Sequence, residues 1–283
     1  MAGFVRVSLC MKNELGGIYM DYISSNKEAW EEAFENRSEG WGENNIYQLK
    51  NEGNPFIEKV LADELNNYDF SNKTIAQFCC NNGRELLSIM KFGASCGIGF
   101  DIAENMVSFA NNTAKELGVN CTFIATDILK IDEQFHDKFD YIFITIGALT
   151  WFQDLSKFFQ KVSLCLKQGG SLIINEVHPV TNMLGISGEE NYDEEVPEKL
   201  MNSYFRKEPW VENSGMGYMT GKAYESKTFY SYSHTFSHIF NAICLNGMNL
   251  KKLSEFDYDI SGSFGQLNNK GIPLSYILVC HKN

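Results

Sequence analysis

Short apolar runs alternate with amphipathic segments through the middle of the chain, and the runs have the length of buried strands. The first run, residues 75–80, breaks at Asn81-Asn82-Gly83. A helix is predicted over residues 84–92, where large apolar side chains share one face, and a second strand over residues 96–100 leads to Asp101. The order of strand, tight turn, helix and strand predicts the first unit of a doubly wound parallel sheet.

The same rhythm continues towards the C-terminus, and a third strand leads to Asp127. The remaining predicted helices cover residues 27–34, 55–65, 104–117, 155–166 and 236–246, and the remaining predicted strands cover residues 121–126, 141–146, 171–177, 249–256 and 275–281. Strands that alternate with helices in this way predict an α/β fold.

The alternation lapses between residues 180 and 232. An acidic run there has the composition of a solvated loop, and aromatic residues then become frequent around a glycine-rich passage, residues 215–221, that predicts a hairpin or turn. Segments of this kind at a sheet edge carry specificity. We therefore expect an inserted substrate cap over residues 180–233. The other predicted parts are an N-terminal helical lid or extension (1–70), a cofactor-binding core (71–179) and the end of that core (234–283).

Composition narrows the function classes. The net charge of −12 disfavours a phosphate backbone or an anionic membrane as partner, because binding either requires a basic footprint. Eight cysteines occur without a C-x-x-C pair, which is typical of reduced cysteines in a cytoplasmic protein and predicts no metal site. No stretch is long and apolar enough to predict a membrane span. A small-molecule partner is therefore expected, with neither nucleic acid nor membrane.

The turn after the first strand and the two strand-end acids form a candidate nucleotide site. Asp101 lies about twenty residues past the turn, where a carboxylate can accept hydrogen bonds from ribose hydroxyls. Asp127 and Ile128 suit the polar edge and the face of an adenine. A dinucleotide would require several glycines near its pyrophosphate, whereas Cys79 and Asn81 stand where glycines are expected. A ligand without phosphate fits better, because asparagine tolerates left-handed backbone angles and cysteine is small.

Several short motifs in this region carry a family resemblance. Residues 77–83 (QFCCNNG) stand where an acid, an apolar residue and a G-x-G-x-G turn form the first motif of that family, with the acid and two glycines replaced. Residues 84–88 (RELLS), 92–94 (FGA) and 99–101 (GFD) match a variant with an L-Q-C-x-x-G turn, and residues 169–174 (GGSLII) match a pattern that is frequent in the family as a whole. The region resembles a class I S-adenosylmethionine-dependent methyltransferase. The resemblance implies a Rossmann-like seven-stranded sheet with the last strand antiparallel, S-adenosylmethionine as cofactor and S-adenosylhomocysteine as product.

The resemblance also implies positions for both ligands. The residues expected to contact the cofactor are Cys79, Asn81, Gly83, Asp101, Ile102, Met106, Asp127, Ile128, Thr145 and Gly147. The residues expected to contact the methyl acceptor are Trp151, His178, Tyr204 and Trp210. Trp41 and Tyr47 are candidates for a lid over the cofactor, or for ordinary packing.

Two histidines are candidate general bases. His178 follows the carboxyl end of a predicted strand, and His234 begins the helix after the cap. A histidine can accept a proton at neutral pH, and a base is needed only if the acceptor arrives protonated. The alternative for each is that the ring pins a loop through hydrogen bonds.

Three function classes remain open. The first is a methyltransferase that acts on oxygen, nitrogen or carbon of a small molecule by in-line transfer. The second is an NAD-type oxidoreductase, which the missing glycines disfavour. The third is a protein that binds the cofactor but has lost catalysis, and the replacements at Cys79 and Asn81 favour it.

Overall fold

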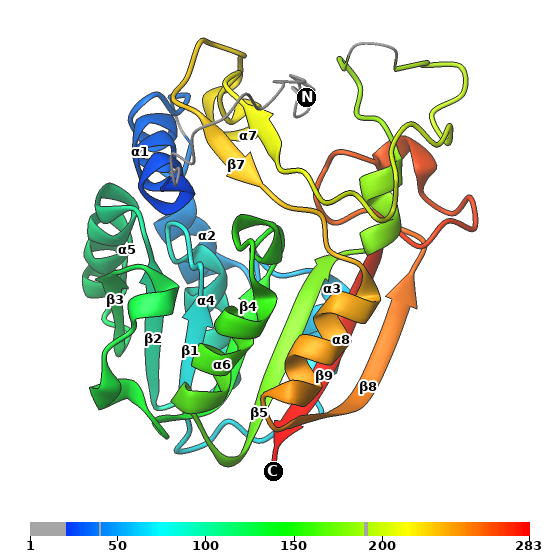
Figure 1. Ribbon diagram of the computed structural model, residues 1–283. Helices are drawn as coiled ribbons and strands as arrows, with labels where there is room; N and C mark the ends of the chain where they lie inside the picture. Colours follow the sequence, from blue (N-terminus) through cyan, green and yellow to red (C-terminus); the bar gives the residue numbers. More distant parts are fainter. Residues whose placement is uncertain (1–20, 40, 190–191) are drawn as a thin grey trace.

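The computed structural model describes residues 21–39, 41–189 and 192–283, and its centre is one large sheet (Figure 1). Its strands are β1 (Thr74–Phe78), β2 (Cys96–Asp101), β3 (Cys121–Ala125), β4 (Phe139–Thr145), β5 (Leu166–Val177), β8 (Met248–Phe256) and β9 (Ser275–Lys282). They are ordered β3-β2-β1-β4-β5-β9-β8. Strands β1 to β5 pair in parallel, whereas β9 runs antiparallel between β5 and β8. The predicted seven-stranded Rossmann-like sheet with an antiparallel last strand is confirmed.

Helices cover both faces of the sheet because successive strand residues point to opposite sides. In β4, Ile142 and Ile144 pack with α6 (Leu155–Cys165) and α8 (Phe236–Leu245). Phe143 between them packs on the other face. The helices of that second face are α3 (Lys59–Leu65), α4 (Arg84–Ile89) and α5 (Glu104–Leu117). The two apolar cores hold the carboxyl ends of the parallel strands at one rim of the molecule.

A helix and a small hairpin lie over this rim (Figure 1). They are α1 (Tyr22–Glu35) and the strands β6 (Trp210–Glu212) and β7 (Phe229–Ser231), with the short helix α7 (Gly217–Thr220) between the strands. The side chain of Asn26 joins α1 to β7, since its amide donates to the Tyr230 carbonyl at 2.9 Å and accepts from the Tyr230 N–H at 2.7 Å. Lys27 ties α1 to Glu104 at the start of α5, at 2.5 Å.

Several predicted element boundaries differ from the structure. Helix α1 begins at Tyr22 rather than at Lys27, and β5 begins at Leu166 rather than at Ser171. Helix α3 begins at Lys59 rather than at Pro55, because Glu58 has an extended backbone and the preceding residues form turns. The glycine-rich passage 215–221 contains α7 rather than the turn of a hairpin, and the hairpin strands pair on either side of it. The short helix α2 (Asn45–Asn51) was not predicted. Residues 1–20 of the predicted N-terminal extension lie outside the described ranges.

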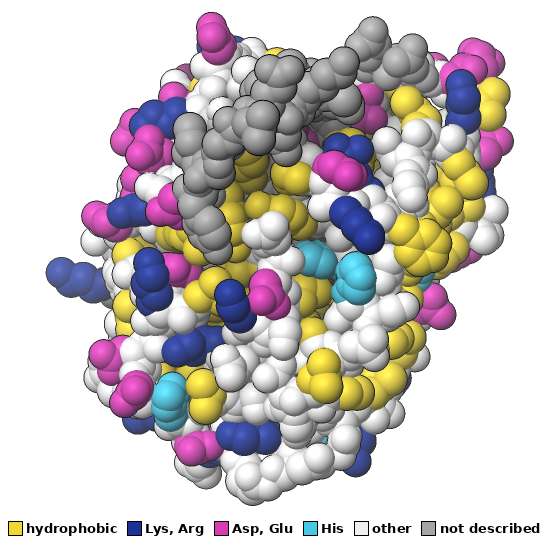
Figure 2. Space-filling view, in the orientation of Figure 1, with side chains coloured by type: hydrophobic (Ala, Val, Ile, Leu, Met, Phe, Trp, Pro, Cys, Tyr) yellow, Lys and Arg dark blue, Asp and Glu magenta, His cyan; other side chains and the backbone are white. Residues whose placement is uncertain are grey.

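Charged side chains of both signs are interspersed on the face shown in Figure 2. Lys and Arg lie next to Asp and Glu around the edges, and hydrophobic side chains gather towards the middle. The described residues visible there form no continuous basic patch, which binding to a phosphate backbone would require. Within the described ranges, none of the helices has both the length and the apolar character needed to cross a membrane.

Candidate active site

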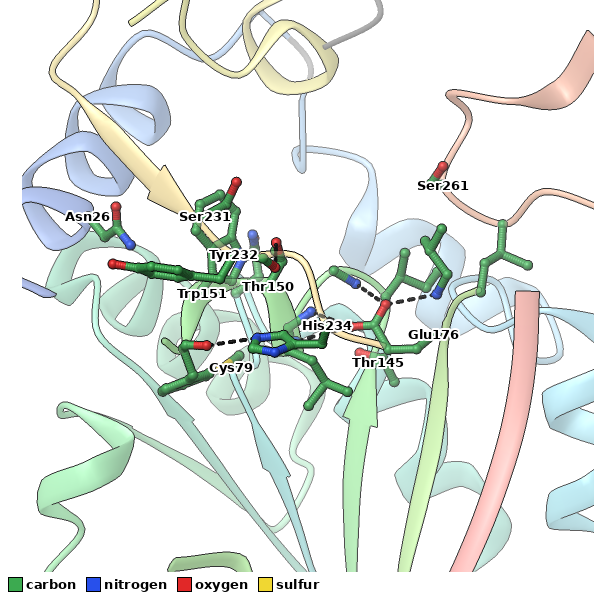
Figure 3. A pocket seen from close by; sticks show the side chains of 18 of the residues that line it. Asn26, Cys79, Thr145, Thr150, Trp151, Glu176, Ser231, Tyr232, His234 and Ser261 are labelled. Carbon is green, nitrogen blue, oxygen red and sulfur yellow. Dashed lines mark hydrogen bonds between the residues drawn. The ribbon is translucent and has the colours of Figure 1, made fainter. Parts of the chain in front are cut away.

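A cavity of about 380 Å³ lies over the carboxyl ends of the parallel strands, beneath α1 and the β6–β7 hairpin. In open α/β sheets this edge is where ligands bind. The turn after β1, the ends of β2 to β5 and the segment between β8 and β9 all contribute lining residues. Figure 3 shows Asn26, Trp151 and Tyr232 grouped above Cys79 and His234 in this cavity. Segments distant in sequence therefore form one site.

The turn between β1 and α4 has a left-handed backbone at three alternating residues. The φ angles are +58° at Cys79, +50° at Asn81 and +79° at Gly83. These are the three positions of the predicted G-x-G-x-G turn, so the chain keeps the backbone of that turn without two of its glycines. Left-handed φ angles are uncommon for residues other than glycine, and asparagine accepts them more readily than cysteine does.

Gly83 has a packing role. A Cβ atom at Gly83 would lie 2.5 Å from the Phe123 ring and 2.9 Å from the Ala110 Cβ, so only glycine fits between α4, α5 and β3. Gly83 does not line the cavity, although the sequence predicted a cofactor contact there. The other nine predicted cofactor residues do line it.

Asp101 at the end of β2 fastens the turn to the sheet. Its Oδ2 accepts a hydrogen bond from the Asn81 N–H at 2.7 Å, and its Oδ1 accepts one from the Ala103 N–H at 3.0 Å. Burial raises the pKa of this carboxyl group, and the bonds from main-chain N–H groups oppose that rise. The pKa of the Cys79 thiol is raised well above its usual range by burial and by the nearby Asp101 carboxylate, so the thiol stays neutral.

The two carboxylate oxygens of Asp127, which follows β3, have different surroundings among the described residues. Its Oδ1 accepts from the Leu129 N–H at 2.9 Å. Its buried Oδ2 accepts no hydrogen bond within the described part of the chain, and the Lys130 Nζ lies 3.5 Å away. Ile128 and Met106 line the cavity nearby and are buried. An unsatisfied carboxylate oxygen beside apolar side chains suits the amino group and the flat faces of a purine.

The loop after β4 is held by Glu176, which the sequence analysis did not single out. Its Oε1 accepts from the N–H groups of Ala148 at 2.6 Å and Leu149 at 3.2 Å. Its Oε2 accepts from Gly147 and Val177, each at 2.8 Å. Burial raises the pKa of Glu176 despite these four bonds. The sequence signal that could have identified this role is the glutamate inside the apolar run 171–177. A carboxylate buried within a strand needs several hydrogen-bond donors around it.

The position of the acid in the first motif is occupied by Gln77. Its Nε2 donates to the Thr145 Oγ1 at 2.7 Å, and both side chains are buried. This bond joins the carboxyl ends of β1 and β4. Thr145 also lines the cavity.

His178 lines the cavity, but hydrogen bonds occupy both of its ring nitrogens. Its Nδ1 accepts from the Val180 N–H at 3.1 Å, and its Nε2 lies 2.8 Å from the Glu255 carboxylate. The ring must therefore carry its proton on Nε2 and donate it to Glu255. Burial lowers the pKa of His178, and the Glu255 carboxylate opposes this shift.

His234 also lines the cavity and is neutral at pH 7. Its Nε2 lies 2.8 Å from the Phe152 carbonyl oxygen, to which it donates, so Nδ1 carries a lone pair. Burial lowers the pKa of His234 to about 4, and the hydrogen bond to Phe152 only partly opposes this shift.

The remaining residues predicted to contact the acceptor lie in two different places. Trp151 lines the cavity and meets the Trp30 ring edge to face, with ring centres 5.2 Å apart. Tyr204 and Trp210 do not line it. The Tyr204 hydroxyl accepts from the main-chain N–H of Phe236, and the Trp210 indole donates to Ser233 at 2.9 Å. Both rings therefore lie outside the cavity.

Several lining residues were missed because no sequence motif marks them. Asn26, Trp30, Glu212 and Tyr232 come from α1 and from the hairpin region. Trp30 lies partly buried in α1, and an amphipathic helix pattern does not indicate which segment such a residue packs against. Of the two lid candidates, Trp41 lines the cavity and Tyr47 is 66% exposed.

Comparison with known proteins identifies what this arrangement resembles. Residues 69–229 match a family model described as a methyltransferase domain. The fold is similar to an S-adenosylmethionine-dependent methyltransferase from Mesorhizobium loti, with a TM-score of 0.58 and 18% identity over 83% of this chain and 100% of that chain. A second such structure, from Clostridium acetobutylicum, gives a TM-score of 0.54 and 15% identity over 79% and 89% of the two chains.

One curated relative matches at the sequence level. It is an uncharacterized protein of Methanocaldococcus jannaschii, 33% identical over 67 residues. These residues are 24% of this chain and 31% of the relative, so the match spans about a third of that protein's length.

Proposed function

Since this chain belongs to the methyltransferase domain family, we propose that it methylates a small molecule bound inside the cavity described above. The enzyme is an S-adenosylmethionine-dependent methyltransferase. When bound, the cofactor supplies a methyl group on a sulfonium, which a nucleophile can displace in line. The protein must then bind both reactants, align them and exclude water.

The residues of the cofactor half suit S-adenosylmethionine. Asp101 has the position and the chemistry to accept hydrogen bonds from ribose hydroxyls. The buried Asp127 Oδ2, which has no hydrogen bond from any described residue, suits an adenine amino group beside Ile128. No phosphate needs to be accommodated, so the Cys79 and Asn81 side chains in the turn are compatible with this ligand.

The cover that α1 and residues 230–232 form over part of the cavity is the observation that carries the small-molecule proposal. Asn26 and Thr150 hold the backbone of residues 230–232 from two sides, and the Tyr232 N–H donates to the Thr150 carbonyl at 2.7 Å. These hydrogen bonds join α1 and Thr150 to residues 230–232 and are here termed the seam. Trp30 and Trp151 lie next to the seam and line the cavity. A small molecule fits beneath this cover, whereas the cover hinders the approach of a folded macromolecule from that side.

We propose His234 as the proton acceptor when the nucleophile arrives protonated. His234 lines the cavity, and donation of its Nε2 proton to the Phe152 carbonyl leaves a lone pair on Nδ1. His178 is less suited, because accepting a proton would break the hydrogen bond from Val180 to its Nδ1. We therefore assign His178 to holding the turn after β5.

Two measurements test the function. Calorimetric titration of S-adenosylhomocysteine should show binding that Asp101→Ala weakens by about tenfold or more. Asp132→Ala, which removes an exposed carboxylate that only caps a short turn, should bind as the wild type does. Failure of the wild-type protein to bind would contradict the proposal.

A transfer assay identifies the acceptor class. The protein is incubated with methyl-labelled S-adenosylmethionine and a cell extract that has been separated into an ultrafiltrate, a protein fraction and a nucleic-acid fraction. Label should enter the ultrafiltrate only, and His234→Gln should lose more turnover than His178→Gln. Label in protein or nucleic acid would overturn the small-molecule assignment, and cofactor binding without transfer would favour a catalytically silent protein.

A further inference from the structure

The cavity continues beyond the cofactor half to the segment between β8 and β9. This part, here termed the distal lobe, is lined by Val177, Pro179, Ile186, Ile260 and Phe264 together with Tyr276. The sheet order places β5 and β9 on the opposite side of β4 from β1, β2 and β3, whose ends carry the cofactor residues. Figure 3 shows Ser261 from the β8–β9 segment on the other side of Glu176 from Trp151. The distal lobe is therefore available to the methyl acceptor.

The distal lobe is apolar and firmly built. Ile186 and Phe264 are buried in one cluster with neighbouring leucines, and Val177 packs against it. The carboxylate of Asp259 holds the β8–β9 segment from outside the cavity, since it accepts from the N–H groups of Ser261 and Phe264, each at 2.8 Å. The lobe is thus a preformed wall rather than a loose loop.

No charged side chain lines the distal lobe among the residues that the structure describes there. Its polar members include the hydroxyls of Ser261 and Ser263. His178 at its edge is a neutral ring that donates its Nε2 proton to the Glu255 carboxylate. The neighbouring Glu176 carboxylate already accepts four main-chain hydrogen bonds. A charged ligand group would lose its hydration here without gaining a counter-charge.

The Tyr276 hydroxyl is a polar group without a partner in this apolar wall. Tyr276 is 0% exposed and lines the cavity, and its hydroxyl makes no hydrogen bond with any described residue. Its ring is held edge to face against Phe236, with centres 5.1 Å apart, and lies 6.2 Å from the His178 ring. Buried hydroxyls are normally hydrogen-bonded, so an unpartnered one at a cavity wall indicates a ligand group that completes it.

We propose that the distal lobe binds the body of the methyl acceptor and selects an elongated, mainly apolar molecule. The part of the acceptor inside the lobe is uncharged and carries a neutral oxygen or nitrogen that hydrogen-bonds to the Tyr276 hydroxyl. The reacting atom lies at the other end, near Trp151 and His234. This inference deepens the proposed function and rests on it.

Three probes with the same chain and different head groups test the inference: 1-octanol, octylammonium and octanoate. Each is titrated at pH 7 into the protein saturated with S-adenosylhomocysteine, and binding is followed by ligand-detected NMR. 1-Octanol should bind, and both charged probes should bind at least about tenfold more weakly. Equal or tighter binding of either charged probe would overturn the proposal.

A pair of isosteric variants tests the role of the hydroxyl. Tyr276→Phe should weaken 1-octanol binding by about tenfold and raise the melting temperature of the ligand-free protein, because a buried unpaired hydroxyl is removed. Tyr258→Phe is the matched control, since the Tyr258 hydroxyl also lacks a described partner but does not line the cavity. Unchanged 1-octanol binding in Tyr276→Phe would refute the assignment.

Each experiment begins with a titration of S-adenosylhomocysteine, which shows whether the proposed function or only the distal-lobe inference has failed. If S-adenosylhomocysteine does not bind, the proposed function fails and the inference fails with it. If it binds and 1-octanol does not, only the distal-lobe inference fails.

Discussion

The carboxylate of Asp101 accepts a hydrogen bond from the main-chain N–H of Asn81 at 2.7 Å, so a strand-end acid fixes the turn after the first strand. The turn keeps its left-handed angles at Cys79 and Asn81 although neither residue is glycine. Anchoring from the neighbouring strand compensates for the backbone preference of these residues. The same carboxylate faces the cavity, so the group that builds the turn also serves the proposed ribose site.

The left-handed backbone at Cys79 predicts an unusual order of stability. Cys79→Gly should be more stable than Cys79→Ala by about 1 kcal/mol, because a Cβ atom is strained at φ +58°. The free energy of unfolding in urea measures the difference between the two variants. Glu116 lies at an exposed position in α5 and provides the comparison. There the Glu116→Ala variant should be more stable than the Glu116→Gly variant by about 1 kcal/mol. The same order at both sites would show that Cys79 is not strained.

Glu176→Gln should lower the free energy of unfolding by about 3 kcal/mol, because an amide cannot accept all four hydrogen bonds that reach this carboxylate. The affinity for S-adenosylhomocysteine should also fall, by about tenfold, because the loop carrying Gly147 loses its anchor.

Asp140→Asn provides the comparison for Glu176→Gln. Asp140 accepts from the Thr74 N–H and from Lys167 at the opposite, amino-terminal edge of the sheet. The Asp140→Asn variant should therefore be less stable than the wild type but should bind S-adenosylhomocysteine with the same affinity. If both variants bound S-adenosylhomocysteine as the wild type does, the loop would not depend on Glu176.

Stability should fall in mild acid because of His234. Its pKa is about 4 in the folded protein and about 6.5 in the unfolded chain. Between these values the unfolded chain binds a proton that the folded protein does not, so the free energy of unfolding decreases as the pH falls. At pH 4, the protonation of His234 in the unfolded chain should have lowered the free energy of unfolding by about 3 kcal/mol.

His234→Gln should flatten that pH dependence, as measured by urea unfolding at a series of pH values. Part of the slope should remain, because the pKa of His178 is also lowered in the folded protein. His136→Gln serves as the control, since its ring does not line the cavity. An unchanged slope in His234→Gln would contradict the burial of a neutral ring.

The seam between α1 and β7 should control how long ligands stay bound. Asn26→Ala removes both hydrogen bonds to the Tyr230 backbone and should increase the dissociation rate of S-adenosylhomocysteine by several-fold, with a smaller change in its association rate. Stopped-flow tryptophan fluorescence can follow dissociation, because Trp30 and Trp151 line the cavity. Asn36→Ala at the other end of α1 should leave the rate unchanged, since its amide bonds only to Glu32 within the helix.

The sequence alone determined the sheet and placed most of the proposed cofactor residues at one edge of it. Apolar runs of strand length, each followed by an amphipathic helix, allow few arrangements other than a doubly wound sheet. Once the strands were known, Asp101 and Asp127 had to lie at the same edge, because the carboxyl ends of parallel strands meet there. The alternation of strands and helices rests on local periodicity, which the sequence expresses directly. The antiparallel last strand and most of the proposed cofactor contacts were implied by the resemblance of short motifs to a family.

Only the tertiary structure decided which residues of the second half reach the cavity. Tyr204 and Trp210 have the same aromatic character as Trp30 and Tyr232, yet the first pair hydrogen-bonds to Phe236 and Ser233 outside the cavity and the second pair lines it. The role of Glu176 likewise depends on partners far away in the sequence, and that of Tyr276 on a hydroxyl for which the described residues offer no hydrogen-bond partner. Such roles follow from long-range contacts between segments, and neither periodicity nor a local motif records where those segments meet.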